Sequence, residues 1–228
     1  MYVMLQFIRY KNVYFLLLIS FYSYSQVNYD AFDHKIGYEN REVLNGRTHH
    51  VDLLFIEGNH LFLDTDRFVK GQVTFKGQSY SLPLKYDVVN DLLVTPYSHR
   101  GLSFSIYLTV NLVNNFTLNN RYFVRLKRNI DLTDIYGNGY FEEKYRKKNF
   151  VLYIKYTKRL FEKLYSDVPR NKAILIKTPI LLVSGRYSII SKKRDLVKLF
   201  PDKKKQIKDF FSHKKVNDQT LLIFLKTI

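Results

Sequence analysis

The sequence predicts an α+β fold in which a predominantly antiparallel β meander, forming a curled sheet or half-barrel, is followed by C-terminal α-helices. Two observations support this prediction. Short segments with alternating apolar residues recur about every ten residues through the middle of the chain, with turn residues between them. Close to residue 191 the spacing of the apolar residues changes to that of helices. The many Tyr and Phe residues favour a sheet that curls, because curling covers one apolar face of an open meander.

Residues 1–25 carry the features of a cleavable signal peptide. Arg9 and Lys11 precede an apolar run over residues 13–21, and small residues follow it up to Ser25. A helix of about ten residues would be roughly 15 Å long, about half the thickness of the bilayer hydrocarbon. We therefore expect cleavage after Ser25, export of the mature chain, and no transmembrane segment within it.

The chain contains no cysteine. Disulfides, thiolate metal sites and an acylated cysteine are therefore excluded. A chain of about 200 residues buries enough apolar surface to fold without disulfides. We expect a single β-rich domain over residues 26–228, with a helical, basic part over about residues 191–228.

The first predicted strands form a hairpin. Residues 68–75 and 78–86 alternate apolar and polar side chains around the turn Lys76-Gly77. Pro83 cannot donate a ladder hydrogen bond, so its strand should lie at an edge of the sheet or carry a bulge. Four more strands are expected over residues 92–97, 102–109, 110–118 and 122–127.

The second half of the chain continues the meander and then becomes helical. Two hairpins are predicted, with strands over residues 139–145 and 150–156, and over residues 174–183 and 185–191. Pro179 again indicates an edge or an irregular strand. Three helices should follow, over residues 192–199, 201–215 and 219–226. Ser191 is a suitable N-cap for the first helix, and Asn217 or Asp218 for the third.

Positive charge is concentrated in the second half of the chain. Residues 26–125 contain 10 Lys and Arg against 10 Asp and Glu, whereas residues 126–228 contain 25 against 10. Such an asymmetry suggests a face that meets an anionic partner. The candidate residues for an anionic-ligand patch are Arg146, Lys147, Lys148, Lys192, Lys193, Arg194, Lys203, Lys204, Lys205 and Lys208. A further basic cluster, interleaved with Tyr153 and Tyr156, consists of Lys155, Lys158 and Arg159.

No motif predicts a catalytic, metal or cofactor site. His49, His50 and Asp52 have the chemistry of zinc ligands, but neighbouring side chains of a strand point to opposite faces, so we expect histidines in a surface loop. Ser184 lies in Val-Ser-Gly, which lacks the glycine pattern of a nucleophile elbow. The sequence has neither a P-loop nor a G-x-G-x-x-G pattern. We therefore expect no cofactor, and we favour a non-enzymatic function.

Two pairs of carboxylates leave an envelope hydrolase open as an alternative. Asp64 and Asp66 share one face of an extended segment, and Glu142 and Glu143 are adjacent. A glycosidase needs two carboxylates that face each other across a sugar, which sequence spacing does not establish. We expect Asp64 and Asp66 to lie in a solvated turn before the first long strand.

Several segments of the chain resemble a group of uncharacterised exported proteins of Bacteroidetes-type bacteria. The segments are residues 71–77, 80–87, 185–193 and 195–200, followed by the lysine-rich helix. The resemblance covers most of the mature chain, and its motifs are structural. It implies a location in the cell envelope, and it implies no activity, ligand or catalytic residue.

These observations favour an exported, non-enzymatic protein that binds or scaffolds through its basic C-terminal half. The predicted partners are anionic lipid or polysaccharide surfaces, since each Lys or Arg near an anionic membrane contributes about 1 kcal/mol. An envelope protein is a further candidate partner, whereas an exported protein seldom meets nucleic acid. The predicted locations are the periplasm, the periphery of the outer membrane and the extracellular space. Besides the hydrolase, the alternative is a periplasmic carrier of an apolar ligand.

Overall fold

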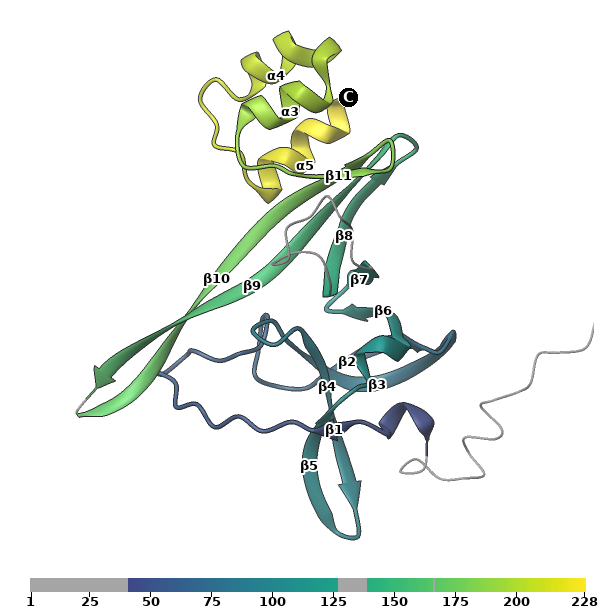
Figure 1. Ribbon diagram of the computed structural model, residues 1–228, viewed down its shortest axis with the longest axis vertical. Coiled ribbons are helices and arrows are strands. Elements are labelled where there is room, and N and C mark those ends of the chain that lie inside the picture. Colours follow the sequence, from purple (N-terminus) through teal and green to yellow (C-terminus); the bar gives the residue numbers. More distant parts are fainter. Residues whose placement is uncertain (1–40, 127–138, 166) are drawn as a thin grey trace, which may run out of the picture. The chain divides into compact units, whose positions relative to one another are not determined.

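An antiparallel sheet of 11 strands organises the computed structural model (Figure 1). The structure describes residues 41–126, 139–165 and 167–228, and the signal peptide predicted for residues 1–25 lies outside them. The spatial order of the strands is β1-β5-β4-β3-β2-β6-β7-β8-β9-β10-β11. The sheet is curled and unclosed, and helices follow it at the C-terminus, so the predicted α+β meander is confirmed. None of the helices in these ranges is long and apolar enough to cross a membrane.

The chain forms two meanders that meet at β2. Strands β2 to β5 run towards one edge of the sheet, and η4 then brings the chain back so that β6 pairs with the other side of β2. The strands are β1 Arg47–Thr48, β2 Val69–Phe75, β3 Gln78–Asp87, β4 Leu92–His99, β5 Leu102–Tyr107, β6 Val113–Leu118, β7 Arg121–Leu126, β8 Gly139–Lys147, β9 Phe150–Tyr165, β10 Val168–Val183 and β11 Arg186–Ile189. The helices are η3 Glu42–Leu44, η4 Val110–Leu112, α3 Lys193–Leu199, η5 Pro201–Lys203, α4 Lys204–Phe210 and α5 Asp218–Thr227.

Two-residue turns join the tight hairpins. The predicted hairpin of residues 68–75 and 78–86 is confirmed as β2 and β3, in which Lys76 and Gly77 have φ values of 50° and 82°. Ser184 and Gly185 connect β10 to β11 with φ values of 50° and 79°. Positive φ at both positions gives the turn a twist that matches the twist of the flanking strands, which fixes the register of both hairpins.

Pro83 was expected at an edge or a bulge and Pro179 at an edge or in an irregular strand, and both lie where the ladder on one side of their strand has not yet begun. β4 pairs only with the end of β3, over Lys85–Asp87, so the ladder on that side begins beyond Pro83. The carbonyl of Pro83 accepts a hydrogen bond from Thr95 Oγ1 at 2.8 Å. β11 likewise begins to pair with β10 one residue beyond Pro179. The missing N–H groups are thus accommodated where a ladder starts, which the sequence alone does not reveal.

The largest difference from the sequence prediction is the length of β9 and β10, which have 16 residues each. The two strands pair over their whole length, from Phe150 with Val183 to Tyr165 with Val168. The predicted strands covered only part of this ladder, because residues 157–173 have few apolar side chains in regular alternation. Regular alternation of apolar side chains arises where one face of a strand is buried. This part of the ladder has no buried face.

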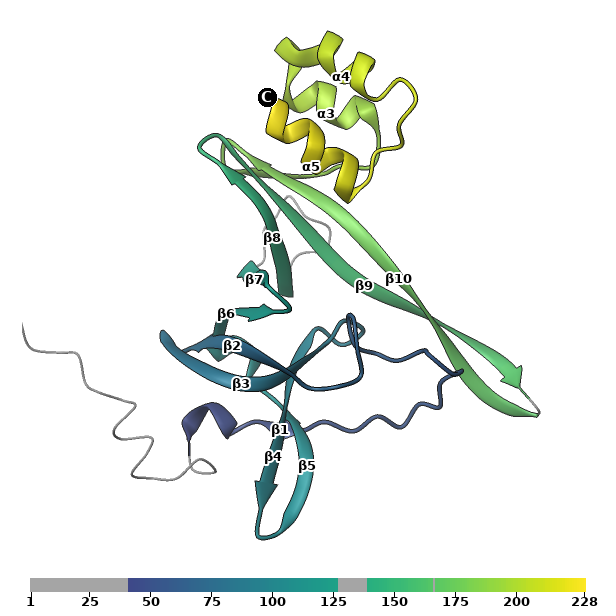
Figure 2. The same cartoon turned by 180° about the vertical axis from the view of Figure 1, so that it is seen from behind.

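Beyond the rest of the sheet, β9 and β10 continue as a two-stranded ribbon. β8 pairs with β9 only as far as Ile154, and β11 pairs with β10 only from Ile180 onward. We call residues 156–165 and 168–178 the β9–β10 arm, and it is visible in both views (Figures 1 and 2). At roughly 3.3 Å per residue, such a ribbon is about 30 Å long.

The C-terminal helices lie where they were predicted, with different ends. α3 begins after Lys192 instead of Ser191, because Asp195 Oδ2 accepts the backbone N–H groups of both residues, at 2.9 and 3.0 Å. The second predicted helix is divided into η5 and a shorter α4. Asn217 caps α5 as predicted, and its Oδ1 accepts the N–H of Thr220 at 2.9 Å. Carboxylate and amide oxygens thus satisfy N–H groups that a helix start leaves free.

Four aromatic side chains form the centre of the core. Tyr86, Phe116, Phe123 and Tyr140 are each at most 1 % exposed. The rings of Phe116 and Phe123 stack with their centroids 4.7 Å apart, and Tyr86 and Tyr140 meet edge to face at 6.0 Å. These geometries favour the aromatic quadrupole interaction. The four rings pack against one another. Their faces are therefore not available to an apolar ligand of the kind that a carrier would hold.

The C-terminal helices close one face of the sheet with their apolar residues. Helix residues in this core are Leu196, Ile207, Phe211, Leu221, Phe224 and Leu225, which belong to the same buried cluster as Leu152 and Leu181 of β9 and β10. The opposite face of β8 to β10 carries a smaller buried cluster of Phe141, Val151, Tyr153 and Ile180. Successive strand residues alternate between these two clusters, so the sheet-embedded half of β9 is fixed on both faces.

Replacing Phe116 with Ala should destabilise the protein strongly. The substitution removes a fully buried ring from the aromatic group, which costs about 3–5 kcal/mol through lost burial and the remaining cavity. Urea unfolding followed by circular dichroism measures the change in unfolding free energy. Leu102→Ala is the matched control, because Leu102 is 70 % exposed and its loss should change the unfolding free energy by less than about 0.5 kcal/mol. Equal effects of the two substitutions would contradict this core.

Candidate anion-binding surface

The turn between β8 and β9 carries three of the predicted cations, which differ in their surroundings. Arg146 donates two hydrogen bonds of 2.6 Å to the two oxygens of Glu143. The Glu143 bonds raise the pKa of Arg146 and neutralise its charge locally. Lys147 and Lys148 are exposed and have no carboxylate partner within the described part of the chain. Two of the three cations are therefore available to an anion.

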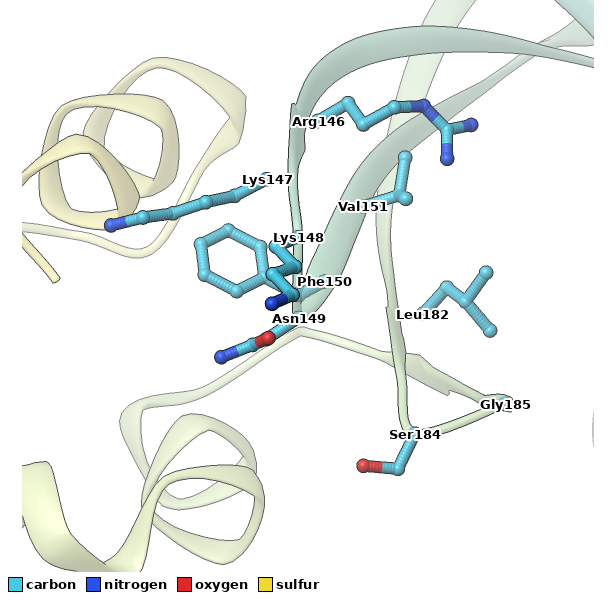
Figure 3. Close-up of a pocket in the computed structure, with 9 residues that line it drawn as sticks. All are labelled: Arg146, Lys147, Lys148, Asn149, Phe150, Val151, Leu182, Ser184 and Gly185. Carbon is cyan, nitrogen blue, oxygen red and sulfur yellow. The ribbon is translucent and has the colours of Figure 1, made fainter.

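A pocket of about 370 Å³ lies beside this turn (Figure 3). The turn from Lys147 to Phe150 forms one wall, and Ser184 and Gly185 of the β10–β11 turn form another. Figure 3 shows the Arg146 and Lys147 side chains extending to opposite sides of the strand, as alternation along β8 requires. The cations of this pocket do not converge on one point, so it lacks the geometry of a chelating anion site.

Three further predicted cations, together with Lys198, line a recess between α3 and α4. Lys193, Arg194 and Lys198 of α3 and Lys208 of α4 line it, and we call it the α3–α4 recess. It has a volume of about 700 Å³, and the remaining lining residues are Val197 and Ser212. The four cations have no carboxylate partner among the described residues. Like charges gathered without counter-charges create a positive potential that attracts anions.

Helix packing explains why these cations gather. Leu196 of α3 and Ile207 of α4 are fully buried in the core, so the polar sides of both helices face outward together. Arg194 and Lys198 are four residues apart, a spacing that places them on one side of a helix. Lys198 was not among the predicted residues, and this i, i+4 relation to Arg194 is the signal in the sequence that identifies it.

The other predicted cations of this region lie outside the recess. Lys192 precedes α3, Lys203 ends η5, and Lys204 and Lys205 begin α4. All four are exposed and have no ion-pair partner in the described ranges. They add to the positive potential of the helical part without lining a cavity.

Two cations of the tyrosine-interleaved cluster are structural. Lys155 is 4 % exposed, and its Nζ donates to Asp91 Oδ2 at 2.9 Å and to the carbonyl of Tyr140 at 3.2 Å. Lys158 Nζ donates to the carbonyls of His60 and Phe62 at 2.7 and 2.5 Å. Desolvation lowers the pKa of Lys158. The expectation of a basic cluster at this point was wrong for both lysines, because Asp91 and backbone carbonyl groups engage their ammonium groups.

The carboxylate pairs do not form a two-carboxylate site. Asp64 is bound by Arg121, and it also accepts from Asn119 Nδ2 at 3.2 Å. Glu142 is buried, where it accepts from the Tyr156 hydroxyl and from Lys144 Nζ. Asp64, Glu142 and Glu143 are therefore each paired with a cation, and Asp66 is exposed. Burial, followed by the bond to Glu142, raises the pKa of Tyr156, so this hydroxyl stays protonated.

His49 differs from the expected surface histidine. Its side chain is 5 % exposed, and Nε2 lies 3.0 Å from Oδ2 of the fully buried Asp87. His50 and Asp52 are exposed, so the three residues do not gather. In the part of the chain that the structure describes, no group of three His, Asp or Glu side chains could hold a metal ion.

No known protein-family model matches the sequence, and no curated protein or solved structure is significantly similar to it. Exposed cations that make no ion pair with the described residues line the α3–α4 recess, whereas Asp64, Glu142, Glu143, Lys155 and His49 are engaged by contacts within the fold.

Replacing Asp87 with Asn should destabilise the protein in a pH-dependent manner. Burial alone would raise the pKa of Asp87, but hydrogen bonds from His49, from the Asn90 side chain and from the N–H groups of Asn90 and Val89 lower it. The carboxylate therefore stabilises the fold fully above its unfolded pKa of about 4, and this contribution is lost as the pH falls through the lower folded pKa.

An Asn amide nitrogen cannot accept the bonds from His49 and Asn90, so we expect a loss of about 2 kcal/mol at neutral pH. Urea unfolding at neutral and acidic pH measures the difference, which should shrink below about pH 4. Asp52→Asn is the control, because Asp52 is exposed. A loss that stayed constant down to the lowest pH would contradict the charged role of Asp87.

Proposed function

We propose that this protein is an exported, non-enzymatic protein that binds anionic lipid or glycan surfaces through its basic C-terminal half. The observation that supports the proposal is that Lys193, Arg194, Lys198 and Lys208 line the α3–α4 recess and make no ion pair with the described residues. Export rests on the signal-peptide features of residues 1–25, which would bring the protein to the cell envelope or beyond.

The charges are numerous enough for useful affinity. Each Lys or Arg at an anionic surface contributes about 1 kcal/mol, so the four recess cations together would contribute roughly 4 kcal/mol. That corresponds to about three orders of magnitude in affinity at low salt. From Lys193 to Ile228 the chain contains ten Lys and Arg against four Asp and Glu, so neighbouring charges reinforce this attraction.

A surface is a better partner for this arrangement than a small anion. The recess is lined by exposed lysine and arginine side chains, and no buried polar group lies among its lining residues. Tight binding of one small anion needs convergent, preorganised donors. A surface or polymer with many anionic groups instead engages dispersed cations at the same time.

The variant in which Lys193, Arg194, Lys198 and Lys208 are all replaced by Gln should bind anionic surfaces about a hundredfold to a thousandfold more weakly at low salt. Sedimentation with phosphatidylglycerol vesicles and retention on immobilised dextran sulfate measure the two surface types. Binding of the unaltered chain should fall steeply as salt rises to about 0.15 M, because exposed charges are then screened within about 8 Å.

A matched control removes the same amount of charge elsewhere. Arg47, Arg67, Lys70 and Arg100 are exposed cations of the neutral half, and replacing all four with Gln should change binding little. Equal losses in the two variants would show that net charge alone matters and would contradict a role for the recess. Failure of the unaltered chain to bind either surface at low salt would refute the proposed function.

A further inference from the structure

The β9–β10 arm presents apolar side chains to solvent at its tip. Leu164 is 75 % exposed, Tyr165 is 58 % exposed, and Phe161 and Val168 are about 40 % exposed. Large apolar side chains gathered at one exposed place usually mark an interaction site. Neither the core nor the α3–α4 recess uses these residues, so they call for a separate explanation.

The register of the ladder places cations beside the apolar side chains on one face of the arm. Cross-strand partners share a face, as do alternate residues along a strand. The basic face defined in this way contains the pairs Arg159–Ile174, Phe161–Lys172, Lys163–Arg170 and Tyr165–Val168. These pairs include four cations and no carboxylate. Glu162 and Leu164 of β9 belong to the opposite face, and the exposed Asp167 lies in the turn at the tip.

The positive charge of the basic face is not compensated by carboxylates of the described residues. Lys163 and Arg170 are direct cross-strand partners, and like charges at such positions repel each other. Arg170 lies over the Tyr165 ring, with 5.7 Å from Cζ to the centroid, and its Nε is shielded from water without a hydrogen-bond acceptor among the described residues. None of the four cations has a carboxylate partner in these ranges. An anionic group placed against this face would relieve the repulsion.

We infer that the β9–β10 arm docks on an anionic lipid bilayer, with its apolar tip inserted among the head groups and its four cations on lipid phosphates. This inference rests on the proposed function and specifies lipid as the surface. A bilayer offers an apolar phase and a layer of negative charge within a few ångströms of each other, which matches the tip and the cations above it. Tyr and Arg suit that boundary, since each has an apolar body and a polar end.

The charge pattern favours lipid over a second copy of this chain. The edge of β9 beyond Ile154 has no ladder partner among the described residues, and such an edge can pair with another chain. On the other side of the arm, Asn171 exchanges backbone hydrogen bonds of 2.8 and 3.1 Å with Leu54 and Ile56, so that edge is covered. Joining two arms would bring two sets of four unpaired cations together, which repulsion opposes, whereas lipid phosphates complement them.

A single tryptophan reports on the tip directly. The chain contains no tryptophan, so Leu164→Trp introduces the sole indole into the full-length protein. Adding vesicles that contain phosphatidylglycerol should shift its emission to the blue, and brominated lipids should quench it. Leu102→Trp is the matched control, because Leu102 is similarly exposed, at 70 %, near the end of the β4–β5 hairpin. Its emission should not change.

A charge variant tests the second part of the inference. Replacing Arg159, Lys163, Arg170 and Lys172 with Gln should weaken vesicle binding by roughly several hundredfold, since each interfacial cation is worth roughly a fivefold change in affinity. Circular dichroism of every variant should match that of the unaltered chain, because the replaced side chains are exposed or half-buried.

The outcomes separate this inference from the proposed function. Vesicle binding with an unchanged Leu164→Trp emission would overturn the arm inference and leave the proposed function standing, as would binding to dextran sulfate without binding to vesicles. A blue shift without vesicles, accompanied by a doubled mass in light scattering, would assign the tip to a second copy and also overturn the inference. Absence of binding to both surfaces would refute the proposed function itself.

Discussion

The uninterrupted pairing of β9 with β10 is the constraint on which the rest of this structure depends. Sixteen residue pairs join the two strands, and different parts of the molecule are built on successive stretches of that ladder. In the first stretch, side chains enter one buried cluster under the C-terminal helices and another on the opposite face. In the second stretch, backbone hydrogen bonds hold the strands where no core covers them. The same ladder therefore supports the helices that carry the recess and extends into the arm.

The sequence predicted the parts of the fold that bury one face. The hairpin around Lys76 and Gly77, the C-terminal switch to helices and the cap at Asn217 each have a local cause, in turn geometry or apolar period, that is visible in the residues. The arm has no local signal of this kind in its sequence. Its strands are held by backbone pairing with each other, and not by the burial of one face. Pro83 and Pro179 lie where one side of the strand is unpaired, but the sequence does not show that a neighbouring strand begins just beyond them.

For the candidate site, the composition showed which half of the chain carries the positive charge. It did not show which of these cations stay free of ion pairs. Lys193, Arg194 and Lys208 are exposed as expected, because short helices with few apolar residues leave their other sides to solvent. Arg146 and Lys155 have the same character in the sequence, yet Glu143 and Asp91 neutralise them in the fold. Which cations stay free depends on contacts between residues that are far apart in the chain, as with Lys155 and Asp91, or on a bulge such as that near Glu143.

The pair of Lys155 and Asp91 crosses the boundary between the neutral and basic halves of the chain. Asp91 follows β3 in the neutral half, Lys155 lies in β9 of the basic half, and Gly139 leaves the space in which they meet, since a Cβ there would lie 1.6 Å from Asp91 Oδ2. A chain cut at the charge boundary would leave a buried charge uncompensated in the basic fragment. The division in charge is therefore not a division into two compact units, since Glu42–Ile228 form one.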